Sequence, residues 1–423
     1  MDITLKKAKV DGQITISGSK SQTIRALLIA TFAKEESVIE NALLSEDILA
    51  CIALCKAFGA TIEQNETTFK VKPPSTFPKE IFVDCANSGT TLYLAVGLAA
   101  TLSSKVTFTG DEQLNERPVG GLLNSLKELG AKITYLEKEN YPPFTIWGPL
   151  KGGTTSIKAH TSQYLSSLML CSPLAQEDVE INVLLLNEKP YAEMTLKWLD
   201  QQNIVYKHKA DFSYFKFQGN QHYKGFKSLI GGDYSSASFF FCAAAVSKGR
   251  VTVHGLDKDD VQGDKEILNI LQTMGCRITW LNHSVTVEGP STSLKGGTFD
   301  LNAIPDTLPV LAVTACFANE KVKLINVEQA RIKETDRIAV MKENLNKLNV
   351  KVKELDDGLI IYGEGKLNGG TCLGYGDHRI IMAMAIASLG ANDAITILGI
   401  DAVKVTFPTF FNQLNEIRLQ SEE

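Results

Sequence analysis

The feature that most constrains this chain is a pattern of about 70 residues that occurs six times. Each copy runs from a strand-like segment through a charged loop into a helix, then through further strands to a second helix. The leading strand-like segments are residues 37–41, 105–110, 179–183, 250–255, 321–326 and 394–399. Because 423 residues are too many for one ordinary core, we expect two domains with three copies in each.

The ends of the first helices share one kind of residue. Gly59, Gly130 and Gly275 follow the helical pattern in three copies, and Asn203 and Asn349 take that place in two others. Gly and Asn adopt the left-handed conformation that commonly ends a helix. We therefore predict a helix end, followed by a strand, at each of these five positions.

The second helix of each copy opens on polar residues and continues as an apolar body. Residues 239–245 and 381–385 are nearly all apolar, and a helix that is apolar on all sides is buried in a core. The polar openings are residues 19–21, 87–90, 161–163, 233–236, 306–307 and 377–379. Buried parallel helices ringed by sheets place these openings on one face of a domain.

Two points at which the chain crosses between domains can be predicted. A strand-like segment, residues 3–16, precedes the first polar opening, and Gly231-Gly232 precedes the fourth. We expect residues 1–18 and 231–423 to form one domain, in which the N-terminal strand pairs. Residues 19–230 form the other domain, with an active-site cleft between the two.

Composition excludes several classes of function. A net charge of -5 argues against nucleic acid or an anionic membrane as the main partner. The eight Cys lack zinc spacing, and Cys51 and Cys55 lie four apart on a predicted helix, as small core residues do. We expect the thiols to be reduced. The N-terminus has no signal-peptide core, and no apolar run is long enough to span a bilayer. We therefore expect a cytoplasmic protein.

Basic residues collect at the junctions of the repeat. Residues 331–337 place five charges at a predicted strand-to-helix loop, where free backbone N–H groups and Arg side chains favour phosphate or carboxylate groups. The cations at such junctions are Lys20, Arg25, Arg117, Lys189, Lys333, Arg337 and Arg379. In an acidic chain they predict a substrate with several negative groups, which Ser21, Ser162 and Gln163 can orient by hydrogen bonds.

Two acids are candidates for proton transfer. Asp306 opens an apolar helix, and Glu334 lies between Lys333 and Arg337. Burial raises the pKa of a carboxyl group and neighbouring cations lower it. Taken alone, either acid is more typical of helix capping or ion pairing than of proton transfer.

Taken together, these motifs resemble the 5-enolpyruvylshikimate-3-phosphate synthase family, whose activity is also called 3-phosphoshikimate 1-carboxyvinyltransferase. The segments that carry the resemblance are residues 18–21 with Arg25, 87–90, 116–118, 162–164, 189–191, 305–306, 333–337, 377–379 and 406–408. They span the chain in the family's order. The resemblance implies two inverse α/β-prism domains, each of three βαβαββ units.

The resemblance also implies a reaction. The enolpyruvyl group of phosphoenolpyruvate is transferred to the 5-hydroxyl of shikimate 3-phosphate with release of phosphate, on the shikimate pathway to chorismate and the aromatic amino acids. Asp306 is the implied base for the hydroxyl, and Glu334 with Lys20 exchanges the proton at the methyl carbon. The family is the target of the inhibitor glyphosate, and no metal or organic cofactor is implied.

The implied binding residues form two groups. Those for shikimate 3-phosphate are Lys20, Ser21, Arg25, Thr161, Ser162, Gln163, Asp306, Gln329 and Lys333. Those for phosphoenolpyruvate are Lys20, Gly89, Arg117, Gln163, Arg337, Arg379 and Lys404. We expect no nucleic-acid or membrane partner, and a monomer.

Three positions depart from the family's pattern. Tyr93-Leu94 stands where Arg-Pro is common, and Val405 stands where Lys is common, with Lys404 one residue earlier. Glu188 replaces a Ser before Lys-Pro-Tyr. An acid beside the shikimate phosphate is repulsive unless it turns away or pairs with Lys189.

Two other functions remain open from the sequence. A sister enolpyruvyl transferase acts on UDP-N-acetylglucosamine and has the same architecture, but it uses a Cys-bearing loop in the second repeat, and residues 105–121 contain no Cys. The second open function is that of a ring-shaped binding protein with six repeats and no catalysis. Its basic residues should line a broad surface instead of gathering at helix starts.

Overall fold

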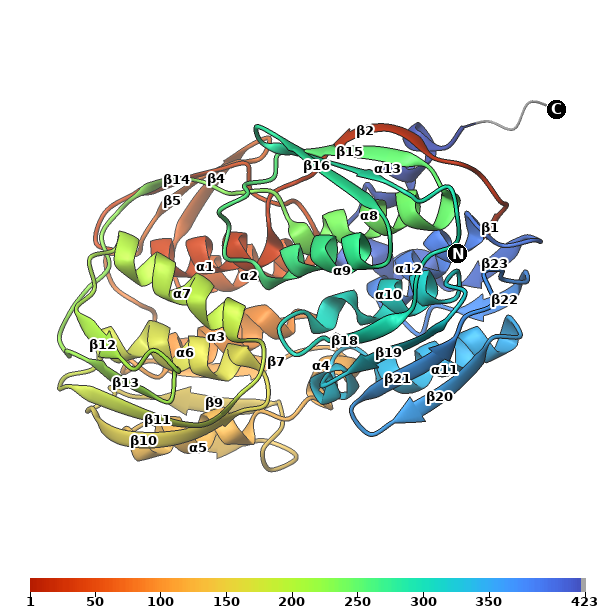
Figure 1. The fold of residues 1–423 in the computed structure, drawn as a ribbon. Helices are drawn as coiled ribbons and strands as arrows, with labels where there is room; N and C mark the ends of the chain where they lie inside the picture. Colours follow the sequence, from red (N-terminus) through yellow and green to blue (C-terminus); the bar gives the residue numbers. More distant parts are fainter. Residues whose placement is uncertain (420–423) are drawn as a thin grey trace. The chain divides into compact units, whose positions relative to one another are not determined.

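The computed structural model describes residues 1–419 and divides into two compact units. Unit 1 comprises Met1–Ser17 and Gly231–Glu423, and unit 2 comprises Gly18–Ile230. Across the described residues, each unit contains three sheets and three buried helices (Figure 1). The repeat predicted from the sequence is therefore present as repeated structure.

The sheets of unit 2 each have four strands. The first consists, in spatial order, of β14 (Lys227–Leu229), β3 (Ser37–Glu40), β5 (Thr68–Lys72) and β4 (Thr61–Asn65). The second consists of β6 (Glu80–Asp84), β7 (Lys105–Thr109), β9 (Phe144–Trp147) and β8 (Lys132–Tyr135). The third consists of β10 (Gly153–Ala159), β11 (Val179–Leu186), β13 (Tyr214–Phe217) and β12 (Tyr206–His208).

Unit 1 contains two sheets of four strands and one of three. The first consists of β2 (Asp11–Thr15), β15 (Arg250–His254), β17 (Ser284–Glu288) and β16 (Arg277–Leu281). The second consists of β18 (Gly297–Asp300), β19 (Lys321–Ile325), β21 (Gly358–Tyr362) and β20 (Lys351–Leu355). The third consists of β1 (Asp2–Leu5), β23 (Ile395–Leu398) and β22 (Gly370–Leu373).

The four-stranded sheets share one topology. An edge strand lies parallel to the leading strand of the copy, and a hairpin pairs antiparallel on the other side, as β6, β7, β9 and β8 do. In two sheets the edge strand lies in the sequence next to a point where the chain passes from one unit to the other. These strands are β2, which lies parallel to β15, and β14, which lies parallel to β3. All six leading strands were predicted from the sequence and are confirmed.

The N-terminal segment differs from the prediction. The sequence predicts one strand-like segment at residues 3–16, but these residues form two strands in different sheets. β1 pairs antiparallel with β23, whereas β2 pairs parallel with β15. Buried Val10 and its backbone bond from Arg250 anchor the chain where the second strand begins. Residues in one alternating pattern can therefore belong to two sheets.

The buried helices are the apolar ones of the sequence pattern. In unit 2 they are α1 (Lys20–Thr31), α3 (Gly89–Ala99) and α6 (Ser162–Cys171), and in unit 1 they are α8 (Tyr234–Ser247), α10 (Leu308–Ala315) and α12 (His378–Ser388). Polar residues cap four of the six: Ser88, Thr161, Asp233 and Asp377 each accept a backbone N–H of the following turn. The predicted burial is confirmed.

The other helices expose one side. In unit 2 they are α2 (Glu46–Ala57), α4 (Glu112–Asn115), α5 (Gly120–Glu128) and α7 (Lys189–Gln201), and in unit 1 they are α9 (Ile267–Thr273), α11 (Arg337–Lys347) and α13 (Phe410–Ile417). Short 3₁₀ turns are η1 (Ser172–Leu174), η2 (Gly263–Glu266), η3 (Pro305–Thr307), η4 (Glu328–Ile332) and η5 (Ile400–Val405). The five predicted helix ends are confirmed, because each carries a positive φ between 56° and 107°. In the described chain, no helix is long and apolar enough to cross a membrane.

Candidate functional site

Unit 1 contains a group of five charged side chains, which we call the arginine–carboxylate cluster: Asp306, Glu334, Arg337, Asp377 and Arg379. Arg337 opens α11 and is 1% exposed. Its guanidinium donates to three carboxylates, at 2.8 Å from Nη1 to Asp306, 2.5 Å from Nη2 to Glu334 and 2.8 Å from Nε to Asp377. The structure thus brings both predicted proton-transfer acids onto one buried cation.

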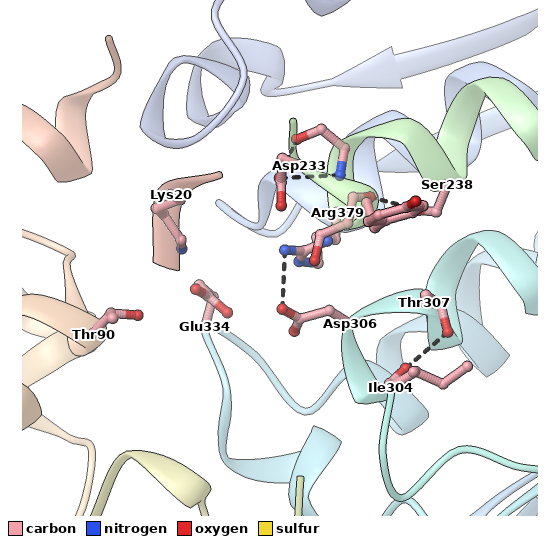
Figure 2. Close-up of polar contacts among 12 residues, drawn as sticks. Lys20, Thr90, Asp233, Ser238, Ile304, Asp306, Thr307, Glu334 and Arg379 are labelled. Atoms are coloured by element: carbon pink, nitrogen blue, oxygen red, sulfur yellow. Dashed lines mark hydrogen bonds and ion pairs between the residues drawn. The ribbon is translucent and has the colours of Figure 1, made fainter. Parts of the chain in front are cut away.

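Arg379 and Asp377 complete the cluster. The Arg379 Nη2 atom lies 3.0 Å from Asp306 Oδ2 (Figure 2). Asp377, which is fully buried, caps α12 by accepting the backbone N–H of Arg379 at 2.9 Å. One carboxylate therefore positions two arginines, one through its side chain and the other through its backbone.

The pKa values in the cluster follow from these contacts. Burial alone would raise the pKa of Asp306, but the charges of Arg379, Arg337 and Lys333 outweigh it and hold that pKa well below its usual range. Burial likewise works against the charge of Arg337, yet Asp377, Glu334 and Asp306 raise its pKa. Asp306 is thus ionised at neutral pH and can accept a proton.

Three further predicted residues of unit 1 differ in their contacts. Lys333 is half-buried, and its charge reaches Asp306. Gln329 is buried, and its Nε2 donates to the carbonyl of Asn302 at 2.9 Å. Lys404 is exposed in η5, and among the described residues no hydrogen bond or ion pair joins it to the cluster.

In unit 2, two of the predicted cations, Lys20 and Arg25, belong to α1. Lys20 Nζ lies 2.9 Å from Asp47 Oδ2 of α2. Arg25 is 1% exposed, and its acceptors in the described part of the chain are all neutral oxygens. Those acceptors are Thr195 Oγ1 at 2.9 Å, Ser21 O at 3.0 Å, Tyr191 O at 3.1 Å and Ser166 Oγ at 3.2 Å.

Because Arg25 is buried with neutral partners, desolvation lowers its pKa to about 10. The group is still charged at neutral pH. In a low-dielectric site a cation without a counter-ion raises the affinity for an anion. Arg25 therefore satisfies a physical requirement of a phosphate site.

The start of α6 brings together Thr161, Ser162, Gln163 and Glu188. Thr161 caps the helix, and Gln163 Nε2 donates to Thr90 Oγ1 of α3 at 3.1 Å. Glu188 Oε2 accepts from the backbone N–H and the hydroxyl of Ser162 and from the hydroxyl of Thr161. The carboxylate therefore points at two residues predicted to bind the shikimate phosphate. Lys189 lies 3.8 Å from Glu193 and above the ring of Phe212.

Gly89 and Arg117 also lie together. A Cβ at Gly89 would come within 2.7 Å of Arg117 Nη1, so a side chain there would displace the guanidinium. Arg117 is 7% exposed, and its Nη2 donates to Asn87 Oδ1 at 2.9 Å. Tyr93, one of the departures, donates to the carbonyl of Pro118 at 3.1 Å.

The sequence alone predicts no role for Asp377, which lies in a polar helix opening, or for Asp47, which lies in the first turn of α2. The signal for Asp377 was its place two residues before Arg379. Within residues 1–419, no group of three His, Cys, Asp or Glu could hold a metal ion, and all eight Cys are buried and free.

Comparisons with known proteins cover nearly the whole chain. The family model described as EPSP synthase (3-phosphoshikimate 1-carboxyvinyltransferase) matches residues 5–414. A curated 3-phosphoshikimate 1-carboxyvinyltransferase from Ruminiclostridium cellulolyticum is 42% identical over 412 residues, which are 97% of either chain. One of the same name from Acetivibrio thermocellus is 43% identical over 417 residues, which are 98% of either chain.

Solved structures agree in fold. EPSP synthase from Acinetobacter baumannii matches with a TM-score of 0.83 at 24% identity, over 99% of this chain and 98% of that one. This match confirms the predicted fold class, two inverse α/β domains built from six repeats.

Proposed function

This chain belongs to the EPSP synthase (3-phosphoshikimate 1-carboxyvinyltransferase) family, and from this premise we propose how its residues carry out the family's reaction. The reaction is transfer of the enolpyruvyl group of phosphoenolpyruvate to the 5-hydroxyl of shikimate 3-phosphate, on the shikimate pathway. The observation that carries it is the full-length match to relatives named for this activity. The alternative acceptor, UDP-N-acetylglucosamine, is not favoured.

Asp306 is the proposed base. It takes the proton of the 5-hydroxyl while the oxygen bonds to the central carbon of phosphoenolpyruvate. The methylene carbon gains a proton from Glu334, assisted by Lys20, and a tetrahedral intermediate forms. The departing phosphate takes the hydroxyl proton from Asp306, and return of the methyl proton to Glu334 leaves the enolpyruvyl ether. The ion pair with Arg337, which keeps the Asp306 carboxylate ionised, supports the assignment of Asp306 as the base.

The two arginines of the cluster couple binding to this step. A carboxylate held by two guanidinium groups is a weak base, because its pKa is low. When Arg337 and Arg379 donate some of their hydrogen bonds to phosphoenolpyruvate in place of Asp306, they stabilise the carboxylate less, and the pKa of Asp306 rises. Binding of the second substrate thereby strengthens the base when it is needed.

We assign the shikimate phosphate to the start of α6 and to Arg25, whose buried charge has no carboxylate partner. The whole set is Lys20, Ser21, Arg25, Thr161, Ser162, Gln163, Asp306, Gln329 and Lys333. The set for phosphoenolpyruvate is Lys20, Gly89, Arg117, Gln163, Arg337, Arg379 and Lys404. Holding two anions side by side contributes proximity and stabilises the departing phosphate.

Phosphate release tests the reaction directly. The protein is mixed with shikimate 3-phosphate and phosphoenolpyruvate, and each is omitted in turn. Release that needs both compounds supports the proposal. Release with UDP-N-acetylglucosamine in place of shikimate 3-phosphate would move the protein to the sister activity.

Asp306→Asn tests the base. The amide cannot accept the hydroxyl proton, so turnover should fall by at least about a hundredfold while shikimate 3-phosphate still binds. A variant with near-normal turnover would remove Asp306 from this role. Glu343→Gln, on the exposed side of α11, is a matched control that should leave turnover unchanged.

We further propose that the protein is a monomer of the cytoplasm. Light scattering at working concentration tests the first statement, and fractionation of cells tests the second.

A further inference from the structure

The strongest unexplained feature of unit 2 is the conformation of Glu188. This residue stands at the N-cap position of α7, where its side chain makes no capping hydrogen bond, with φ 57° and ψ 41° in the left-handed region. Few residues other than Gly and Asn adopt that region without strain, and such strain persists where the surroundings impose it. Glu188 is 2% exposed, so the surroundings here are the packed starts of α6 and α7.

Its carboxylate is held by donors of α6. Oε2 accepts from Ser162 Oγ at 2.8 Å, from Ser162 N at 3.0 Å and from Thr161 Oγ1 at 3.1 Å. Two hydroxyls and a backbone N–H that converge on one oxygen are the donor set by which a helix start binds a phosphate oxygen. Glu188 supplies that oxygen from within the chain.

A second observation places a charge beside this donor set. Arg25 donates to Ser166 Oγ, one helical turn after Ser162, and to the carbonyl of Tyr191, in the first turn of α7. Its partners are all neutral. The region therefore contains a buried cation without a carboxylate and, one turn away, a carboxylate bound by the helix start.

We propose that Glu188 is an internal competitor for the shikimate phosphate. In the free protein its carboxylate occupies the Thr161 and Ser162 donors, and the phosphate must displace it from them to bind. The bound substrate also supplies an anion to Arg25, which has no carboxylate partner among residues 1–419. The proposal rests on the function given above, since it takes shikimate 3-phosphate as the ligand of this site.

A consequence distinguishes competition from a structural role. Removal of the Glu188 charge should strengthen binding of shikimate 3-phosphate and of inorganic phosphate, whereas shikimate, which lacks the phosphate, should bind equally well before and after. A residue that only supports the fold would weaken all three or change none of them.

The test uses Glu188→Gln, which keeps the size of the side chain and removes its charge, and Glu188→Ser, which removes both. Calorimetric titration of each folded variant with shikimate 3-phosphate, shikimate and inorganic phosphate gives the affinities. We expect the KM for shikimate 3-phosphate to fall by about tenfold, with the KM for phosphoenolpyruvate unchanged. Glu193→Gln is the matched control, because it removes a charge from the exposed side of α7 and should change none of these values.

Two outcomes would overturn the inference. One is a KM for shikimate 3-phosphate that stays the same or rises in Glu188→Gln, and the other is an equal gain for shikimate. If Glu188→Ser does not fold, Glu188→Gln decides alone. If the wild-type protein releases no phosphate from the two substrates, the proposed reaction fails, and the titration with inorganic phosphate still shows whether Glu188 competes for the donors.

Discussion

Two arginines with the same burial have opposite surroundings. Arg25 in unit 2 and Arg337 in unit 1 are each 1% exposed. Arg337 is bound by three carboxylates, whereas Arg25 donates to two hydroxyls and two carbonyl oxygens. Accordingly the pKa of Arg337 is raised, and burial lowers that of Arg25 to about 10.

The difference separates two uses of a buried cation. A cation that is already neutralised organises the acids around it, and breaking such a group costs several kcal/mol because charges are left buried and unpaired. Burial of a cation among neutral partners costs desolvation free energy, and a bound anion can offset that cost. Arg337 thus holds the catalytic acids in place, while Arg25 is suited to recognise substrate.

The largest expected effect follows from Arg337→Ala. Asp306, Glu334 and Asp377 would lose their common partner, so the free energy of unfolding should fall by about 3–5 kcal/mol. Urea denaturation measures this loss. Any folded fraction should also show a raised KM for phosphoenolpyruvate. An unchanged KM would remove Arg337 from the substrate site and leave it a structural residue.

Arg25→Met should affect substrate binding more than it affects the stability of the fold. Loss of a buried, uncompensated charge offsets much of the lost hydrogen bonding, so the free energy of unfolding should change by less than about 2 kcal/mol. Affinity for shikimate 3-phosphate should fall by about 2–5 kcal/mol, as for removal of a charged partner of a buried anion. Equal losses of stability in this variant and in Arg337→Ala would break the comparison.

Acid titration sharpens the comparison further. The pKa of Asp306 is lower in the folded chain than the unfolded value of about 3.9. Its ion pairs therefore stabilise the fold fully above that value, and this stability is lost as pH falls through the folded pKa. Melting temperatures of Asp306→Asn below about pH 4 should decline less steeply than those of the wild type. Parallel curves would show that Asp306 carries no such linkage.

The smallest effect is expected at Arg331, six residues before Arg337. Its side chain is 26% exposed and pairs with Asp336 at 2.7 Å and Glu354 at 2.9 Å. Solvent screening limits such pairs, so Arg331→Gln should cost about 1 kcal/mol or less, with both KM values unchanged. If Arg331→Gln lost as much stability as Arg337→Ala, solvent exposure would not determine how much an ion pair contributes to the free energy of unfolding.

Local sequence signals predicted most of the fold. The Gly and Asn residues that end the first helices, and the apolar bodies of the second helices, depend on backbone conformation and burial alone, which the residue types reveal. The single strand-like pattern at residues 3–16 failed because alternation reports which side is buried and carries no information on which strand is the partner.

The site was predictable as a set of residue types and not as a set of contacts. Cations at helix openings were visible in the sequence. The pairing of Arg337 with Asp377, or of Arg25 with Thr195, joins side chains 40 and 170 residues apart. Such pairings depend on how the helices pack, and so does the side to which Glu188 turns.

The pairing of β1 with β23 has a consequence for synthesis of the chain. Asp2–Leu5 is synthesised nearly four hundred residues before its partner, Ile395–Leu398. Unit 2, by contrast, is one continuous stretch, Gly18–Ile230, which is finished before most of unit 1 exists. β1 must therefore remain available through the making of nearly four hundred further residues, until its partner strand has been synthesised.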